Sequence, residues 1–369
     1  MVQITKDAAY DAASPHDFPA MLEPSRYGRR TEAFDRIIAL SSDHFWDPRD
    51  ARYIDFATPF DMGAVQMMPD EFFPFFLTKL GESLTPEQKI LYVSESMRWG
   101  VSSVLHGEQG ALALSASLCH ILKDASAQEY AANQTREEAR HVTAFSAYIK
   151  VRWGTPLAAG PTLVALLNEI VQAGEVYKKI VGMQMLVEGL AMGAFATFYK
   201  KCADPLLVKL SQLVMTDEAF HHKFGKMWAD RTIPKLSHEE HHAVEDWAVR
   251  CFQTLLFNLI APEQMKPVYA AVGIDWQEAQ AQVTEAFTDE HRRQQMKGSA
   301  NIFRVLIKTL LTAGIITERT RAFYAMYVDM EELEAESEAM VGDAIAEDGL
   351  RYLKVINAAD ATRSWLAAG

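Results

Sequence analysis

The sequence predicts an all-α protein built on a bundle of long helices. After Pro86 the chain runs without proline as far as Trp153, which leaves room for two long helices in succession. Capping and stop signals divide most of the remaining chain into further helical stretches, and convincing β signals are few. We therefore expect one helical domain rather than a mixed fold.

The segment 1–85 is expected to be an irregular N-terminal arm that packs on the helical core. Prolines break any long helical run in it, at Pro15, Pro19, Pro24, Pro48, Pro59, Pro69 and Pro74. Its aromatic stretch 68–81 is interpreted as a lid over the core, with a contact to a partner or substrate as the alternative reading.

The segment 86–235 is expected to form the core. The stretch Ser83-Leu-Thr-Pro-Glu87 supplies a capping residue and a first-turn proline, and Lys123-Asp124 is a plausible tight connection. Glycine and proline signals end the later helices. The expected helices are 86–122, 125–152, 162–174, 175–202 and 206–230.

The segment 236–369 is expected to add C-terminal helices to the same domain. Ser237 and Glu240 have the spacing of a capping box, and Pro262 is a stop signal. The expected helices lie near 237–260, 263–293, 298–313 and 316–340. The acidic run 329–348 is interpreted as a solvated helix face or tail.

Composition excludes several classes of protein. The chain has 369 residues, of which 49% are hydrophobic, so it can bury a large core. A formal net charge of -13 argues against a nucleic-acid surface. Three widely spaced cysteines are typical of a reducing compartment, and neither a signal peptide nor an apolar run of membrane-spanning length is recognisable. We expect a cytoplasmic protein without a membrane partner.

Two short motifs carry the chemistry. TREEARHVTAF contains Glu138-x-x-His141, and TDEAFHHKF contains Glu218-x-x-His221. On a helix, positions i and i+3 lie on one face, so each carboxylate and imidazole can point at the same ion. Each motif is therefore half of a potential metal site.

The spacing of two further glutamates connects these motifs. Glu108 precedes Glu138 by thirty residues, and Glu188 precedes Glu218 by the same interval. With a turn midway, the first Glu of each pair lies ~22 Å before the turn on one helix, and the second lies ~22 Å after the turn on the next helix. The two carboxylates therefore meet at one height. The chain thus contains a quasi-repeat of two hairpins, each with Glu followed by Glu-x-x-His.

The surroundings of these glutamates favour a metal cluster. Glu108 and Glu188 lie in apolar segments, where an unpaired carboxylate is costly. Four carboxylates balance two divalent ions when the imidazoles are neutral; ordinary buried ion pairs are the competing interpretation. Glu239-x-x-His242 has the same motif spacing, but it falls in the first turn of an expected exposed helix, where it serves the helix dipole.

On these residues the sequence resembles the ferritin-like diiron carboxylate superfamily. REEARH and TDEAFHH are similar to the paired motifs of bacterial multicomponent monooxygenase hydroxylase subunits and soluble acyl carrier protein desaturases, and HGEQGALA resembles the first-ligand helix of the hydroxylases. The resemblance covers about 86–230. It implies a ferritin-like four-helix bundle core with additional helices, as in ribonucleotide reductase small subunits.

The resemblance also implies roles for individual residues. Glu108, Glu138 and His141 would hold one iron, and Glu188, Glu218 and His221 the other, with some carboxylates bridging. Glu137 and Asp217 would accept the free imidazole N–H of the opposite motif's histidine. Arg140 matches the family's arginine, whereas its counterpart in the second motif is Phe220.

The donor set suits two iron ions, with manganese at one or both sites as a variant. The expected function is an O2-activating diiron oxygenase or oxidase that hydroxylates or N-oxygenates a small or medium apolar substrate. An acyl-chain desaturase and, from another class, a ferroxidase or iron-storage protein are the alternatives. The expected partners are O2, the substrate, an external electron donor such as a ferredoxin or reductase, and a second copy in a homodimer.

Three departures refine this expectation. Phe145 stands where ribonucleotide reductase small subunits have the radical tyrosine, which disfavours radical generation. Ala191 and Met192 stand where the monooxygenases and desaturases place a threonine. The residues expected to line an apolar substrate pocket, with core packing as the alternative, are Leu112, Phe145, Met185, Met192, Phe195 and Phe224.

Overall fold

The protein is all-α, as the sequence predicted. The computed structural model describes residues 4–41, 44–260, 262–288, 290–291, 301–336, 339–340 and 342–360. Within these ranges the chain is helical with irregular connections and forms no strand, apart from one isolated antiparallel bridge between Ala12 and Leu122.

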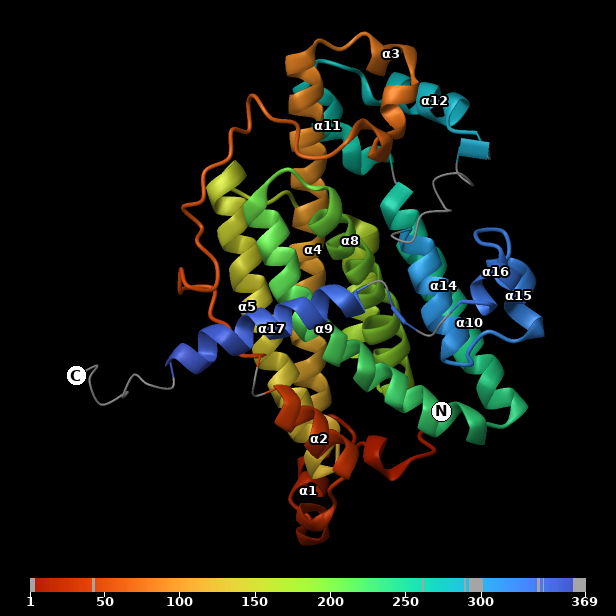
Figure 1. Cartoon of the computed structure of the whole chain (residues 1–369). Helices are drawn as coiled ribbons and strands as arrows, with labels where there is room; N and C mark the ends of the chain where they lie inside the picture. The colour runs from red at the N-terminus through yellow and green to blue at the C-terminus, as the bar shows by residue number, and fades with distance from the viewer. Residues whose placement is uncertain are drawn as a thin grey trace.

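Two helical hairpins form the core of the molecule. Helices α4 (Pro86–Ile121) and α5 (Ala125–Trp153) form the first, and helices α8 (Glu188–Lys201) and α9 (Pro205–Thr232) form the second. The four helices run side by side through the centre of the molecule (Figure 1). The ends of α4, α5 and α9 agree with the predicted ends to within a few residues, and so does the end of α8, but α8 begins at Glu188 rather than at residue 175.

Local capping explains where these helices begin. The Thr85 side chain accepts from the Gln88 backbone N–H while the Gln88 side chain accepts from the Thr85 N–H, which is a complete capping box. Asp124 and Asp204 cap α5 and α9 in the same way, by accepting from backbone N–H groups in the first turn. Each hairpin therefore turns at a capping aspartate.

The predicted helix 175–202 contains a π-helical segment. After the short α7 (Val176–Lys179), residues Ile180–Val187 form the π-helix η6, and the Glu188 backbone N–H bonds the Met183 carbonyl five residues earlier. The wider turn ends at Glu188, and π-helical turns are frequent at functional sites. Val176–Lys201 is the one described stretch long and apolar enough to cross a membrane, but 78% of its apolar window is buried inside the molecule.

The N-terminal arm is a series of short helices that packs along the core. It comprises η1 (Ala8–Tyr10), α1 (Phe18–Met21), η2 (Pro24–Gly28), α2 (Glu32–Ser41), η4 (Asp70–Phe72), η5 (Pro74–Leu77) and α3 (Lys79–Glu82). Tyr10 ties it to the core by donating to the Phe224 carbonyl, 3.1 Å away. In the aromatic stretch 68–81, Phe75 packs on Tyr92 of α4 and on Tyr269.

The remaining helices flank the core. They are α6 (Pro161–Gln172), η7 (Ile233–Lys235), α10 (His238–Ile260), η8 (Pro262–Met265), α11 (Lys266–Ala271), α12 (Trp276–Ala286), α14 (Ile302–Thr312), α15 (Glu318–Tyr324), α16 (Met330–Glu334) and α17 (Asp343–Asp360). The predicted capping box at Ser237 and Glu240 is present. Helix α17 crosses α9 (Figure 1).

Two predicted long helices were wrong. The stretch 263–293 is broken at Gly273, which has a φ of 77°, and Asp275 then caps the new helix α12. The stretch 316–340 is broken where Asp329 caps α16. Local capping thus overrides the helical pattern at both places. Part of the predicted helix 298–313 and of the acidic run 329–348 lies outside the described residues.

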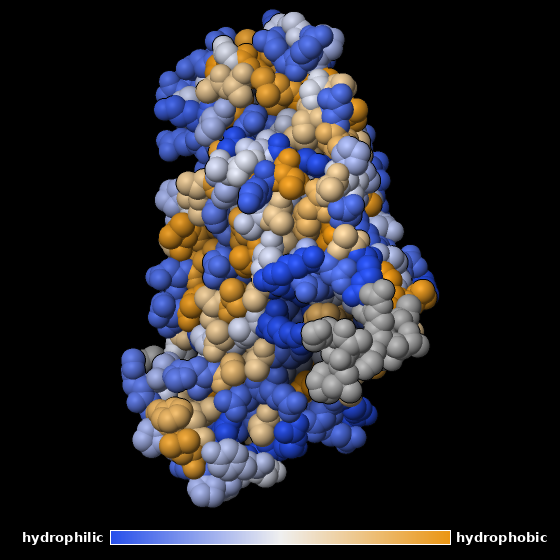
Figure 2. Space-filling model, turned by 90° about the vertical axis from the view of Figure 1, so that its left-hand side faces the viewer, coloured by the Kyte–Doolittle hydropathy of each residue, from blue (hydrophilic) through white to orange (hydrophobic). Residues whose placement is uncertain are grey.

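The surface at the left of Figure 1 has no exceptional character. Figure 2 turns this side toward the viewer and shows hydrophilic and hydrophobic residues interspersed over it. That mixture is ordinary for a solvated protein surface.

Candidate metal centre

The six predicted ligand residues come together inside the four-helix core. Glu108, Glu138, His141 and Glu218 form one group, and Glu138, Glu188, Glu218 and His221 form another, with donor atoms within 4.8 Å of one another in each. All six side chains are buried. One Glu from each of α4 and α8 and one Glu-x-x-His from each of α5 and α9 is the arrangement of ferritin-like carboxylate proteins.

Both histidines turn their Nδ1 atoms inward. His141 Nδ1 lies 3.3 Å from both Glu138 and Glu218, and His221 Nδ1 lies 3.0 Å and 3.3 Å from the same two carboxylates. Glu108 also lies 3.2 Å from His141 Nδ1. Glu138 and Glu218 therefore stand between the two imidazoles, where they can serve both metal positions.

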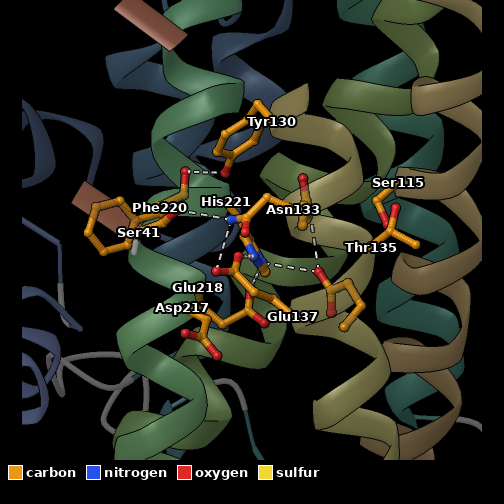
Figure 3. A network of polar contacts seen from close by, with 12 residues as sticks. Ser41, Ser115, Tyr130, Asn133, Thr135, Glu137, Asp217, Glu218, Phe220 and His221 are labelled. Atoms are coloured by element: carbon orange, nitrogen blue, oxygen red, sulfur yellow. Dashed lines mark hydrogen bonds and ion pairs between the residues drawn. The ribbon is translucent and has the colours of Figure 1, made fainter. Parts of the chain in front are cut away.

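The outward Nε2 atoms are held by carboxylates of the opposite motif. His141 Nε2 lies 2.8 Å from Asp217, and His221 Nε2 lies 2.9 Å from Glu137. Figure 3 shows His221 and Glu137 pointing toward one another from α9 and α5. Such partners fix the ring orientation and leave Nδ1 available to an ion.

Asp217 is the more strongly anchored of the two outer carboxylates. The Arg140 guanidinium donates to both of its oxygens, and the indole of Trp46 donates to it at 2.9 Å. The Trp46 ring, fully buried, also stacks on His141 at a centroid distance of 6.1 Å, and Arg140 lies over that ring. The N-terminal arm thus supplies part of the site.

His44, a second residue of the arm, joins both outer carboxylates. Its Nε2 lies 3.3 Å from Glu137 and 3.3 Å from Asp217, and its ring stacks on Phe220 at 4.6 Å. Asn133 donates a further bond to Glu137 at 3.0 Å (Figure 3). The first motif has Arg140 at this position, and the second motif has Phe220. His44 lies on the Phe220 ring, where it contacts both outer carboxylates.

Two buried glutamines orient the remaining carboxylates. Gln134 donates to Glu138 at 3.2 Å and to Glu188 at 3.1 Å, and Gln184 donates to the Gln134 carbonyl oxygen. Each glutamine lies four residues before a candidate ligand, hence on the same helix face.

The charges of the cluster are unequally compensated. Burial raises the pKa of Glu108 to about 8 and raises the pKa of Glu188 well above its usual range. Burial also acts to raise the pKa of Glu138, but the neighbouring imidazoles lower it overall. Although burial opposes protonation of His141 and His221, the surrounding carboxylates raise the pKa of both rings. The cluster holds more negative charge than its protein surroundings balance.

The donor set fits a pair of divalent metal ions. Five buried atoms of the cluster make no hydrogen bond: Glu108 Oε1, Glu138 Oε2, Glu188 Oε2, Glu218 Oε2 and His221 Nδ1. Three of them only approach an oppositely charged partner at 3.0–3.3 Å, and Glu108 Oε1 and Glu188 Oε2 lack even that contact. Buried polar atoms are ordinarily hydrogen-bonded, so this concentration of free ligand atoms favours a bound cation. Two divalent cations would use these atoms and balance the four carboxylates.

A cavity of about 840 Å³ reaches the cluster from the side of α4 and α8. Glu108, Glu188 and Glu218 line its inner end, and mostly apolar residues line the rest. This volume is in the range of small-molecule sites.

None of the six residues predicted for a substrate pocket lines this cavity. Phe145 stacks on Phe195, and Phe224 stacks on Tyr130, in the packed interior. Met185 and Met192 are also buried, and Leu112 is half-buried on α4. The cavity exists instead where the lining residues of α4 and α8 are small, as at Gly107 and Ala191.

The third Glu-x-x-His motif, Glu239-x-x-His242, does not join the cluster. Glu239 and His242 are both exposed on α10. Five contributing residues were not identified from the sequence: His44, Trp46, Asn133, Gln134 and Gln184. The glutamines carry a detectable signal, since they lie one turn from ligand residues, whereas nothing local marks His44 or Trp46.

Known proteins give limited additional information. No family model matches the chain, and no curated protein is similar to it. One similar solved structure is an R2-like ligand-binding oxidase with an aerobically reconstituted metal cofactor after photoconversion; it is 17% identical, with a TM-score of 0.41 over 71% of this chain and 92% of that chain. Another, an R2-like ligand-binding oxidase with a Mn/Fe cofactor, is 17% identical, with a TM-score of 0.40 over 69% and 89%. Similarity of this size assigns no activity to the chain.

Proposed function

We propose that the protein is an O2-dependent dimetal oxidase or oxygenase that acts on an apolar organic substrate. The observation that carries the proposal is the group of unpaired buried donors at the inner end of an apolar cavity. Carboxylate and imidazole donors favour iron, with manganese as the alternative at one or both positions. Two ferrous ions held there would supply electrons to O2 and yield an oxidant for C–H or N–H bonds.

The residues of the chain have distinct tasks in this proposal. Glu108, Glu138, Glu188, Glu218, His141 and His221 hold the metals. Glu137 and Asp217 orient the two imidazoles, and Arg140 holds Asp217. The apolar cavity wall excludes water from the reacting substrate.

The reaction requires a reductant from outside the chain. Hydroxylation combines the substrate R–H with O2, two electrons and two protons to give R–OH and water. We propose a ferredoxin or a reductase as the electron donor. A homodimer in the cytoplasm is the proposed state of the protein, and the three free cysteines suit that reducing compartment.

A desaturase is the second candidate because the cavity extends far along α8, from Glu188 to Lys201. Desaturation removes two hydrogens from adjacent carbons and, with O2, two electrons and two protons, releases two waters. Product analysis separates the two reactions. A ferroxidase or storage protein would instead accumulate many irons and form no organic product.

The first experiment measures metal content. We expect about two iron or manganese ions per chain and a loss of most of this metal in Glu138→Ala. Glu239→Ala is the matched control, since it removes an exposed glutamate with the same motif spacing. Unchanged metal content in Glu138→Ala would contradict the proposed ligand set.

The second experiment exposes the anaerobic ferrous protein to O2. We expect uptake of O2 and an optical spectrum of the oxidised cluster within a single turnover. Absence of both changes in metal-loaded protein would reject the oxidase proposal, whereas continued uptake of many irons would favour storage.

A further inference from the structure

The two buried glutamines reach only two of the four carboxylates of the cluster. Gln134 donates from its side-chain nitrogen to Glu138 at 3.2 Å and to Glu188 at 3.1 Å. In the described part of the chain, Glu108 and Glu218 make their polar contacts with the two ligand histidines alone. Those contacts use the Nδ1 atoms, which metal ions would occupy. A donor that is independent of the metals therefore reaches one pair of carboxylates and not the other.

Gln184 fixes the orientation of the Gln134 amide. Its side-chain nitrogen donates to the Gln134 carbonyl oxygen at 3.1 Å, and both side chains are fully buried. A flipped Gln134 amide would place its oxygen against two carboxylates and its NH2 group against another NH2 group. The amide therefore keeps its donors on Glu138 and Glu188. It bonds Oε1 of each carboxylate, and Oε2 of each makes no hydrogen bond.

The repeat of the ligand residues does not extend to this amide pair. Each glutamine lies one helical turn, four residues, before a ligand glutamate. The residues at the corresponding places, four before Glu218 and four before Glu108, are Val214 and Val104. A valine side chain donates no hydrogen bond. The amide pair is therefore confined to one side of a cluster whose ligands occur twice.

The two ligand histidines create no comparable difference. An outer carboxylate lies 2.8 Å from His141 Nε2 and 2.9 Å from His221 Nε2, so each ring has an orienting partner. The two carboxylates between the rings can serve both metal positions. The remaining difference is between Glu188, which Gln134 holds, and Glu108, which no such donor holds. We call the position of Glu188 and His221 the supported position, and that of Glu108 and His141 the unsupported position.

We propose that Gln134, held by Gln184, is a positioning residue that makes the supported position bind a divalent ion before, and more tightly than, the unsupported position. The inference rests on the dimetal site of the proposed function but not on its reaction with O2. A carboxylate that is already held in one orientation loses less conformational freedom when an ion binds. The amide also stabilises the ionised form of Glu188, which is the form that binds a metal.

Crystals of the full chain test the order of filling without any substitution. Metal-free protein is mixed with an equimolar amount of Mn²⁺ in the absence of O2, and anomalous diffraction gives the manganese occupancy of each position. We expect about tenfold more manganese at the supported position, because partners of ligand residues change metal affinity by about 10- to 100-fold. Equal occupancy, or more manganese at the unsupported position, overturns the inference.

Titration with Co²⁺, followed by visible absorption, tests the role of the amide itself. Glu188→Ala should remove the tighter binding step, and Glu108→Ala should remove the weaker one. Gln134→Met keeps a side chain of similar length without its donors, so it should weaken the tighter step about 10- to 100-fold and the weaker step less. Gln184→Met touches no ligand directly and should weaken the tighter step by a smaller factor. Gln172→Met, an exposed change on α6, is the control and should leave both steps unchanged.

A purely structural role of Gln134 predicts a different result. Loss of packing around the cluster would weaken both binding steps by the same factor, and urea unfolding of the metal-free Gln134→Met protein would show the lost stability. Equal weakening of the two steps, or no weakening of either, overturns the inference.

The reaction with O2 is measured separately on the fully loaded protein. Unequal filling in a protein that does not react with O2 would support this inference and reject the proposed oxidase. Uptake of O2 by a protein that fills both positions equally would do the reverse.

Discussion

The two halves of the cluster have matching donors and different supports. On the first side, His141 is held by Asp217, which a buried arginine and the Trp46 indole fix in place. On the second side, His221 is held by Glu137, whose partners are Asn133 and His44. The two halves therefore share the same ligand residues, but the residues that hold those ligands differ. The two helical hairpins supply the same donor residues twice. The N-terminal arm occurs only once, and its residues His44 and Trp46 contact the two sides differently.

This asymmetry predicts a larger effect at Asp217 than at Glu137. Asp217→Asn leaves Arg140 buried beside a neutral amide, so we expect the free energy of unfolding to fall by about 3 kcal/mol. Metal affinity should fall about 10- to 100-fold because His141 loses its orienting carboxylate. Urea unfolding and metal titration measure the two effects.

Glu137→Gln provides the matched comparison on the second side. Its nearest guanidinium atom is 3.6 Å away, so the loss of charge should destabilise the fold by only about 1–2 kcal/mol. Asp230→Asn, an exposed change on α9, should lie within about 0.5 kcal/mol of the parent protein. A larger effect at Glu137 than at Asp217 would contradict the assigned order of support.

His44 is predicted to couple the two sides. His44→Ala removes one buried contact from each outer carboxylate and the ring stacked on Phe220, at a cost of about 2–3 kcal/mol, although the oxygens concerned keep Asn133 and Arg140 as donors. His44→Asn should restore part of this loss. A double-mutant cycle with Glu137→Gln should give a coupling energy of at least about 0.5 kcal/mol, and strict additivity would show that His44 only fills space.

Trp46 is predicted to act on the first side alone. Trp46→Phe keeps an aromatic ring near His141 but removes one hydrogen bond to a carboxylate, which should lower stability by about 1.5 kcal/mol. The spectrum of a cobalt-substituted protein should change more at one metal position than at the other. Equal changes at both positions would argue against a one-sided role.

Phe220 should give the smallest effect. Phe220→Leu removes the ring stacked on His44 but no hydrogen bond, so we expect a loss of about 0.5–1 kcal/mol and nearly unchanged metal affinity. A loss of metal as large as that in Asp217→Asn would mean that ring stacking, not hydrogen bonding, positions His44.

The helices of the core and the convergence of the ligand residues could be anticipated because both depend on local rules. Thr85, Asp124 and Asp204 mark helix starts, and equal intervals of thirty residues place the glutamates at one height. The same pattern reading failed at Gly273 and Asp329, where a local break outweighs helical periodicity.

The cavity could not be anticipated in the same way. Large apolar residues such as Phe145 and Phe195 suggest a pocket lining, yet they pack against one another. The cavity depends instead on small residues of α4 and α8, beside which neighbouring helices leave space. Whether a neighbour fills such a gap is a property of helix packing and leaves no trace in one segment of sequence.

By itself the sequence determined an all-α chain with two helical hairpins and the convergence of six donor residues, because helix geometry converts residue spacing directly into position. Only the tertiary structure decided which residues support those donors and where a substrate could approach. His44 and Trp46 lie far along the chain from Glu137 and Asp217, and they meet them solely because the arm folds back over α5 and α9. Long-range packing of this kind depends on the whole chain at once.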